Sequence, residues 1–127
     1  MKLKMSDVIK LNKLYDKIKT LSLSISTTYK FSKLFASIQE EANFYGAQWN
    51  QLIQEYGQKD ENGQYILSDN NEQVQIATEN VPIVKQKLGE LLNLEVDVPD
   101  TSFNLDELES VNLSVEEFSY LLPFILS

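Results

Sequence analysis

Any chemistry in this sequence has to come from carboxylates, lysines, tyrosines and hydroxyls, because its 127 residues include neither cysteine nor histidine. The absence of cysteine excludes disulfides, thiolate metal sites and cysteine nucleophiles. The absence of histidine removes the commonest general base near neutral pH and the commonest metal ligand, so Ser-His catalysis, Cys-His catalysis and ordinary zinc sites are excluded. Paired carboxylates are therefore the first candidates for acid–base chemistry.

Three clusters of acidic residues could supply such a pair, since two carboxyl groups at a suitable separation can act as acid and base. Adjacent positions on a helix point about 100° apart, however, so their side chains seldom converge. We therefore expect solvated helix surface at all three clusters and assign no catalytic residue. The clusters are Glu40 with Glu41, Asp106 with Glu107 and Glu109, and Glu116 with Glu117.

Metal and phosphate sites are not indicated either. The segment 60–63 has the acidic and glycine content of a calcium loop, but counting from Asp60 the loop lacks glycine at position six and glutamate at position twelve. We expect a plain turn there. The four glycines are isolated, so no glycine-rich phosphate loop is present. We therefore assign no metal and no cofactor.

The charge of the chain is unevenly distributed. All eleven basic residues are lysine, and the lack of arginine's bidentate fork disfavours specific nucleic-acid binding. The net charge of −8 divides into +6 for residues 1–33 and −14 for residues 34–127. Two interpretations stay open: the lysines solvate the first helices and the two halves attract each other, or the acidic portion steers the protein toward basic surfaces.

The elements that must position these groups are predicted to be mainly helical, because apolar residues recur at helical spacing. Three core helices are expected, at residues 7–21, 29–56 and 81–93. Residues 22–28 are expected to form a connection between the first two. The absence of any apolar run near the ~20 residues of a membrane span, and the lysine-rich start, predict neither a membrane helix nor a signal peptide.

Local signals predict where the helices begin and end. We expect Ser6 to be the N-cap of the first helix, and Gly57 to end the second in a left-handed conformation. Asn80 with Pro82 should open the third. A capping spacing of three residues predicts a short turn at 105–109, from Asn104 with Glu107, and a final helix from 115, from Ser114 with Glu117. The apolar C-terminus should dock on the bundle or on a partner.

The remaining segments are expected to be irregular or extended. Residues 57–76 form a polar excursion that we expect to be mobile, with a small hairpin formed by 64–67 and 73–76. Residues 94–98 alternate apolar and acidic side chains and predict a short strand.

Aromatic residues gather near the middle of the second helix. Tyr45 and Trp49 lie on its expected core stripe, where packing is favoured over stacking against nucleic-acid bases. Phe44 lies off that stripe. Phe44 either widens the buried stripe or, with Gly46 permitting close approach, marks a surface for a partner or for a second copy of the chain.

Several stretches of the chain resemble a family of small uncharacterised bacteriophage and prophage proteins of low-GC Gram-positive bacteria. They are Glu41-Ala-Asn-Phe-Tyr45, Leu52-Ile-Gln-Glu-Tyr-Gly57, Lys59-Asp-Glu-Asn-Gly63, Leu91 to Val98, and Leu113-Ser-Val-Glu-Glu-Phe-Ser-Tyr-Leu-Leu-Pro-Phe-Ile125. The likeness spans most of the chain. It implies expression in the cytoplasm of an infected cell, and it carries over no catalytic residue.

We therefore expect one mainly α (α+β) domain over residues 1–127, with a three-helix core, a small β-hairpin or short strands, and a C-terminal helix. Its expected function is non-enzymatic protein binding in a phage, in virion assembly. The alternative is a counter-defence or host-takeover inhibitor that binds a host protein or sequesters a nucleotide signal. No nucleic-acid or membrane partner is expected, and self-association is left open. The candidate contact residues are Phe44, Asp106, Glu107, Glu109, Glu116 and Glu117.

Overall fold

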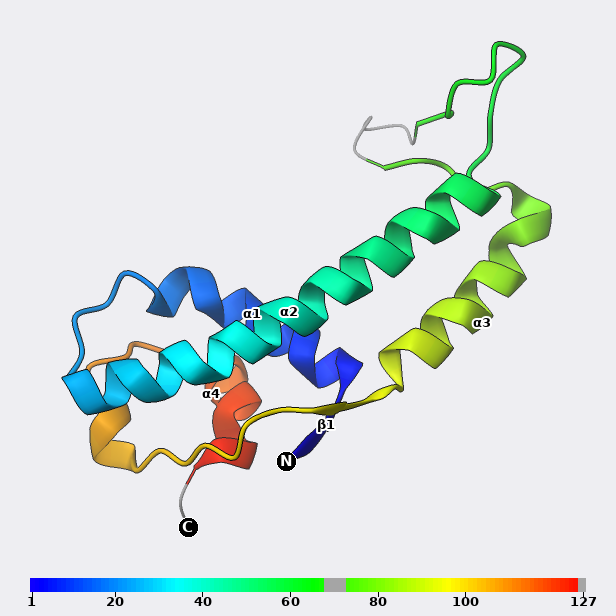
Figure 1. Cartoon of the computed structure of the whole chain (residues 1–127). Coiled ribbons are helices and arrows are strands. Elements are labelled where there is room, and N and C mark those ends of the chain that lie inside the picture. The colour runs from blue at the N-terminus through cyan, green and yellow to red at the C-terminus, as the bar shows by residue number, and fades with distance from the viewer. Residues whose placement is uncertain (68–72, 126–127) are drawn as a thin grey trace. The chain divides into compact units, whose positions relative to one another are not determined.

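A computed structural model describes residues 1–67 and 73–125 and is mainly α-helical with a two-stranded antiparallel β element (Figure 1). This confirms the fold class that the sequence predicts. In chain order the elements are β1 (Lys2–Lys4), α1 (Met5–Ile18), α2 (Ile25–Tyr56), the 3₁₀ turn η1 (Thr78–Asn80), α3 (Val81–Leu92), β2 (Glu95–Asp97), the 3₁₀ turn η2 (Leu105–Leu108), α4 (Val115–Leu121) and the 3₁₀ turn η3 (Leu122–Phe124).

The chain divides into two compact units. Unit 1 comprises Met1–Asn43 with Leu94–Ser127, and unit 2 comprises Phe44–Asn93. This division is based on contacts and does not test whether the two units fold cooperatively. The prediction of a single domain therefore stays a prediction.

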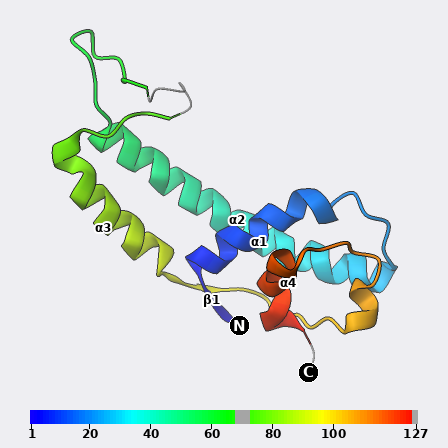
Figure 2. The same cartoon turned by 180° about the vertical axis from the view of Figure 1, so that it is seen from behind.

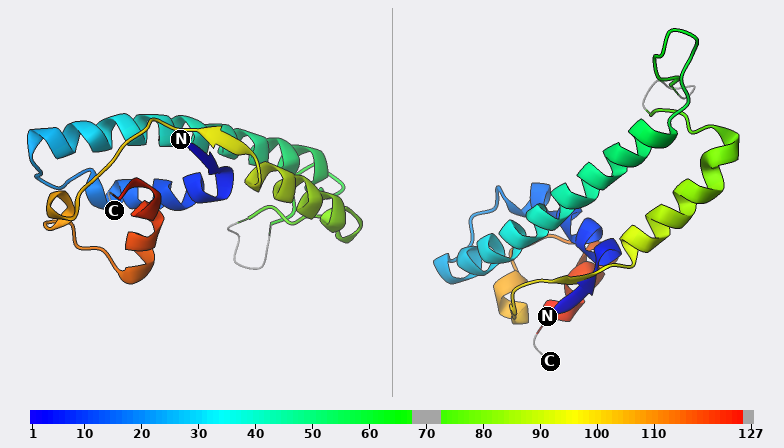
Figure 3. Two further views of the ribbon diagram at one scale, coloured as in Figure 1. Left: turned by 90° about the horizontal axis from the view of Figure 1, so that it is seen from below. Right: turned by 45° about the vertical axis from the view of Figure 1, so that its right-hand side comes forward.

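In unit 1, β1 and β2 lie side by side and pair antiparallel (Figure 3). Leu3 is opposite Val96, and both of these side chains are buried. The N-terminal amine adds contacts to the Val98 carbonyl at 3.2 Å and to the Asp100 carboxylate at 2.8 Å. The strand expected at 94–98 is thus confirmed over Glu95–Asp97. Its partner β1 was not predicted, because three residues are too few to show a period and their pairing depends on a segment far along the chain.

Helix α1 begins earlier and ends earlier than expected, at Met5 and Ile18. The prediction of Ser6 as N-cap is wrong. The N-cap is Lys4, whose side chain makes no capping bond, and the Met5 amide instead donates to the Leu94 carbonyl at 2.9 Å. The predicted apolar stripe is confirmed, since Val8, Leu11, Leu14 and Ile18 are buried.

Helix α2 begins at Ile25, so the expected connection at 22–28 is wrong over its second half. Ser24 allows this early start, because its hydroxyl accepts from the Thr27 amide at 3.2 Å and its carbonyl from the Thr28 amide at 2.8 Å. Within unit 1 the helix buries four apolar side chains: Phe31, Leu34, Phe35 and Ile38.

Gly57 follows the last residue of α2, as predicted, but the prediction that it is left-handed is wrong. Gly63 is the glycine with positive φ, at 78°. The Gly57 amide donates to the Ile53 carbonyl at 2.7 Å, and a Cβ on Gly57 would lie 2.5 Å from that oxygen. Glycine is therefore needed here for close backbone approach rather than for its φ.

The C-terminal segment docks within unit 1, which confirms that it is no loose tail. Helix α4 packs against α1 (Figure 2), and Leu121 and Phe124 are buried. Phe103 is fully buried, forms a parallel bridge with Ile125, and stacks on Phe31 at a centroid distance of 4.4 Å.

Unit 2 holds the end of α2, the excursion and α3, whose start at Val81 matches the prediction and whose end falls one residue earlier. Asn80 is the N-cap residue of α3 and Pro82 lies in its first turn, as predicted, although the Asn80 side chain makes no capping hydrogen bond. Asn80 also ends η1 in a helical conformation, so the turn leads directly into α3.

The excursion 57–76 is held by single backbone bridges over its described residues. The predicted hairpin is reduced to one bridge, between Leu67 and Val74, and residues 68–72 lie outside the described part. A turn at 60–64 is closed by the Asp60 carboxylate, which accepts from the amides of Asn62 and Gln64 at 2.9 and 3.0 Å. The expected mobility of this segment stays a prediction.

Candidate functional site

Two capping boxes begin the helical turns of the acidic C-terminal segment. The Asn104 side chain accepts from the Glu107 amide at 2.9 Å, and the Glu107 carboxylate accepts from the Asn104 amide at 3.1 Å. Ser114 and Glu117 make the same reciprocal pair at the start of α4, at 3.1 and 2.9 Å. Both capping predictions are confirmed, and both occupy residues that were also candidates for partner contact.

The Glu107 carboxylate is held by hydrogen bonds and an ion pair within unit 1. Lys30 donates to both of its carboxylate oxygens, at 2.8 and 2.9 Å, and to the Ser102 carbonyl at 2.9 Å. The Thr27 hydroxyl donates to the same carboxylate at 3.2 Å. Lys30, followed by the Asn104 amide, lowers the pKa of the Glu107 carboxyl, whose side chain is only 15% exposed. Glu107 is thus a structural ion-pair partner, and its nomination as a contact residue stays a prediction.

Glu117 has a similar structural role. Its carboxylate pairs with Lys17 at 2.9 Å while it caps α4. The Ser114 amide, followed by Lys17, lowers the pKa of the Glu117 carboxyl. This ion pair joins α4 to α1. The Glu117 carboxylate, like that of Glu107, is therefore paired within unit 1, and its nomination as a contact residue stays a prediction.

The other three acidic candidates are exposed and available. Asp106 and Glu109 form no side-chain hydrogen bond or ion pair within the described part of the chain, and Glu116 accepts only from the Tyr120 hydroxyl, at 2.9 Å. The apolar residues that precede Asp106 and Glu116 in the sequence are exposed as well: Leu105 is 60% exposed and Val115 is 91% exposed. We call these five residues, Leu105, Asp106, Glu109, Val115 and Glu116, the acidic contact surface.

Chemically, this set suits recognition of a cationic protein surface. Free carboxylates attract lysine and arginine side chains and accelerate association, although each exposed pair contributes at most about 1 kcal/mol. Isolated exposed apolar side chains are ordinary on protein surfaces. The feature that distinguishes this segment is the combination of free carboxylates with exposed apolar side chains, because its other carboxylates are paired.

A chain of hydroxyl groups leads to Glu107 and resembles a proton relay. The Ser24 hydroxyl donates to Thr27 at 2.9 Å, and Thr27 donates to Glu107. These three residues line an open cavity of about 370 Å³, together with Leu23, Asn104, Asp106 and Ser110. Glu107 is a weak base, however, because Lys30 keeps its pKa low. The relay therefore stabilises the start of α2 and does not activate Ser24.

Acid–base chemistry by a carboxylate pair needs one carboxyl group with a raised pKa. The carboxyl groups whose pKa values depart from normal in the described residues are Asp100, Glu107 and Glu117, and all three are lowered. Nor does the described part contain a group of three or more acidic residues placed to hold a metal ion. The structure thus supplies no support for enzymatic chemistry, and the non-enzymatic assignment stays a prediction.

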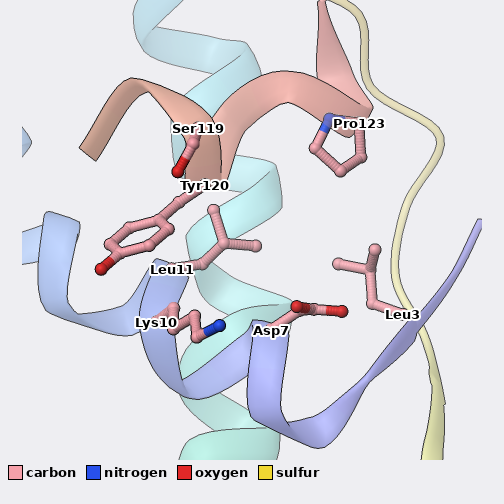
Figure 4. Close-up of a pocket in the computed structure, with 7 residues that line it drawn as sticks. All are labelled: Leu3, Asp7, Lys10, Leu11, Ser119, Tyr120 and Pro123. Atoms are coloured by element: carbon pink, nitrogen blue, oxygen red, sulfur yellow. The ribbon is translucent and has the colours of Figure 1, made fainter. Parts of the chain in front are cut away.

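A second pocket, of about 180 Å³, lies between α1 and the C-terminal helical turns (Figure 4). Leu3, Leu11 and Pro123 line its apolar part, and the charged side chains Asp7 and Lys10 line it as well. Both charged side chains are exposed to solvent. Charges this open to water bind a small ligand weakly, so we assign no ligand here.

Phe44 lies in unit 2 and is 46% exposed, which favours the contact interpretation over full burial. Tyr45 and Trp49, expected in the core, are only partly buried. The five acidic candidates belong to unit 1. The nomination of Phe44 and the acidic candidates as contact residues stays a prediction.

The sequence already indicated that the carboxylates of Glu107 and Glu117 have local hydrogen-bond partners, because the capping spacing pairs them with Asn104 and Ser114. Lys17 and Lys30 were missed as their ion-pair partners because they lie 100 and 77 residues away. The same long-range pairs confirm the interpretation that the basic and acidic halves attract each other.

Comparisons with known proteins give no match: no family model, no curated protein and no solved structure is similar to this chain. No helix in the described part is both long enough and apolar enough to cross a membrane.

Proposed function

We propose that this chain is a non-enzymatic accessory protein of a bacteriophage that acts by binding another protein through the acidic contact surface. One observation carries the contact assignment. Asp106, Glu109 and Glu116 form no ion pair within the described residues and lie next to exposed Leu105 and Val115, on a segment whose remaining carboxylates are held in ion pairs. The phage setting derives from the family resemblance, and within it a structural protein of the virion is the first candidate partner.

A second candidate is an inhibitor that binds a host protein. The same surface favours it, because free carboxylates complement the basic surfaces with which host proteins bind nucleic acid. Sequestration of a nucleotide signal has less support. Four lysines of residues 1–33 that could hold phosphate are already in ion pairs: Lys2, Lys17, Lys19 and Lys30.

The test is a pull-down with the tagged full chain from infected and uninfected host lysates. Its key variant carries Asp106→Asn, Glu109→Gln and Glu116→Gln, which neutralise the three free carboxylates. The matched control carries Glu61→Gln, Glu79→Gln and Glu90→Gln, which change the net charge equally at exposed positions of unit 2.

A protein retained by the wild type and the control but lost by the key variant supports the proposal. Recovery of phage structural proteins from infected lysate favours assembly, and recovery of the same host protein from both lysates favours inhibition. Equal retention by all three forms, or retention by none, overturns the assignment of the contact surface.

A further inference from the structure

The turn at residues 60–64 contains an asparagine that is followed directly by glycine. Asn62 is the only asparagine of the sequence with glycine after it. Because glycine has no Cβ, its main-chain nitrogen can approach the preceding side chain without hindrance. Asn62 is therefore the asparagine of this chain that is best placed to react with its own main chain.

The surroundings of Asn62 and Gly63 are open to water. Both residues are exposed, and a Cβ built on Gly63 would meet no atom within 4 Å. The Asn62 carboxamide makes no hydrogen bond within the described residues. Asn104 is the opposite case, because its side chain accepts from the Glu107 amide at 2.9 Å and the bulkier Leu105 follows it.

The main-chain nitrogen of Gly63 is restrained by the turn. Its amide donates to the Asp60 carbonyl at 3.0 Å. The Asp60 carboxylate accepts from the amides on either side, those of Asn62 and Gln64, at 2.9 and 3.0 Å. A nitrogen whose hydrogen is donated in this way is a poor nucleophile, so the turn has to open before the nitrogen can attack. Exposed backbone hydrogen bonds in a short turn open far more readily than those of a core.

We infer that Asn62 is a site of spontaneous deamidation, at a rate restrained by the hydrogen bonds of Asp60. The Gly63 nitrogen loses its proton and forms a bond to the side-chain carbonyl carbon of Asn62. The carbon–nitrogen bond of the carboxamide breaks, and its nitrogen takes up a proton and leaves as ammonia. The product is a five-membered succinimide ring, which water then opens at either carbonyl to give aspartate or isoaspartate. Water is the only other reactant.

Either product changes the charge and the geometry of the turn. Each adds a carboxylate beside Asp60 and Glu61 in a chain whose net charge is already −8. Isoaspartate also routes the main chain through the former side chain and lengthens it between residues 62 and 63. This extra length falls inside the turn that pairs Lys59 with Tyr65, so we expect that bridge to be lost in the isoaspartate product and kept in the aspartate product. The inference does not depend on the proposed contact surface in unit 1.

The test incubates the purified full chain at mildly alkaline pH in water labelled with heavy oxygen, followed by proteolysis and mass spectrometry of the peptides. The carboxamide of Asn62 should be converted to a labelled carboxylate at least about tenfold faster than any other asparagine, because a residue with a Cβ follows each of the others. Gly63→Ala should slow the reaction by a similar factor. Alanine is strained at the φ of 78° and would loosen the turn, which acts in the opposite direction, so a slower reaction reports hindrance by the methyl group.

Two further substitutions test the restraint by the turn. Asp60→Ala removes the carboxylate that accepts from the Asn62 and Gln64 amides, and it should accelerate the reaction severalfold. Glu61→Gln is the matched control. It removes a neighbouring charge that accepts no hydrogen bond within the described residues, so it should leave the rate unchanged.

A reaction at Asn62 that is the fastest in the chain, is slowed by Gly63→Ala and is accelerated by Asp60→Ala supports the inference. A synthetic peptide of residues 58–66 provides the positive control for the chemistry. If the peptide reacts while Asn62 of the folded chain reacts no faster than the other asparagines, the inference is overturned. Equal rates for Asp60→Ala and the wild type, or equal acceleration by Glu61→Gln, overturn the assignment of the restraint to the hydrogen bonds of Asp60.

Discussion

Units 1 and 2 differ in how fully they bury their apolar residues. The buried apolar side chains of the described part belong to unit 1, except Leu52, Val84 and Leu91. Unit 1 has several layers around its core, formed by α1, α2, α4 and the β1–β2 pair (Figure 2). Unit 2 has a helix pair and a bridged excursion. Because burial supplies most of the stability of a fold, we expect unit 1 to hold the greater share.

The two units also use their lysines differently. The ion pairs of the described residues all lie in unit 1, and the least exposed carboxylate among them is that of Glu107, which pairs with Lys30. Lysines lie over aromatic rings in both units, for example Lys30 over Phe103 at 5.7 Å in unit 1 and Lys87 over Tyr56 at 5.2 Å in unit 2. The difference between the units is therefore in the ion pairs, not in the cation–π contacts.

The largest expected effect is that of Phe103→Ala in unit 1. Phe103 is fully buried and stacked on Phe31, so its truncation should lower the free energy of unfolding by about 3–5 kcal/mol. Tyr29→Ala, at a ring that is 63% exposed, is the control and should change it by less than about 1 kcal/mol. Guanidinium unfolding measures both. A loss below about 1 kcal/mol for Phe103→Ala would contradict the assignment of the core.

The same experiment examines the single-domain prediction, because Trp49 is the one tryptophan and lies in unit 2. Its fluorescence reports unit 2, and far-UV circular dichroism reports helix in both units. A single domain predicts that Phe103→Ala moves both transitions together. If the Trp49 transition stays in place while the other moves, the units unfold separately and the single-domain prediction is wrong.

The next largest effect concerns the ion pair that holds η2 against α2. Lys30→Met removes the cation beside Glu107 and leaves a carboxylate that is only 15% exposed, so we expect a loss of about 1–2 kcal/mol in the free energy of unfolding. Lys17→Met breaks the more exposed pair with Glu117 and should cost less than about 1 kcal/mol. Urea unfolding of both variants provides the comparison. Equal losses in the free energy of unfolding would show that the lower exposure of the Lys30–Glu107 pair does not make it more stabilising than the Lys17–Glu117 pair.

The sequence predicted what local chemistry determines. The apolar spacing of Val8, Leu11 and Leu14 located the buried face of α1, and the capping pairs located η2 and α4, because each signal lies within one or two helical turns. The start of α2 was misplaced because Ser24 was not recognised as a cap, although serine before a helical run is a known signal.

What the sequence did not predict depends on contacts across the chain. β1 exists because β2, more than ninety residues later, pairs with it. Glu107 appeared to be a free surface acid because Lys30 is 77 residues away. The exposure of Phe44, which periodicity left open, is decided by how many helices surround α2, and no local pattern specifies that number.

A smaller effect is expected from acid. The pKa of the Glu107 carboxyl is lowered in the folded state from its usual 4.5, chiefly by Lys30. The unfolded state therefore takes up a proton first as the pH falls below about 4.5, and this contribution to stability is lost as the pH falls on through the folded pKa. Urea unfolding at a series of pH values should show this decline, and Glu107→Gln should reduce its slope. An unchanged slope would mean that Glu107 does not contribute.

The smallest expected effect on stability is that of Phe44→Ala in unit 2, because its ring is 46% exposed. We expect a loss of less than about 1 kcal/mol in the free energy of unfolding, against about 3–5 kcal/mol for the matched control Phe35→Ala, whose ring is 3% exposed on the same helix. A loss as large as that of Phe35→Ala would place Phe44 in a core and contradict its exposed position, and the contrast between a well-buried unit 1 and a less buried unit 2 would then depend on the partly buried Tyr45 and Trp49.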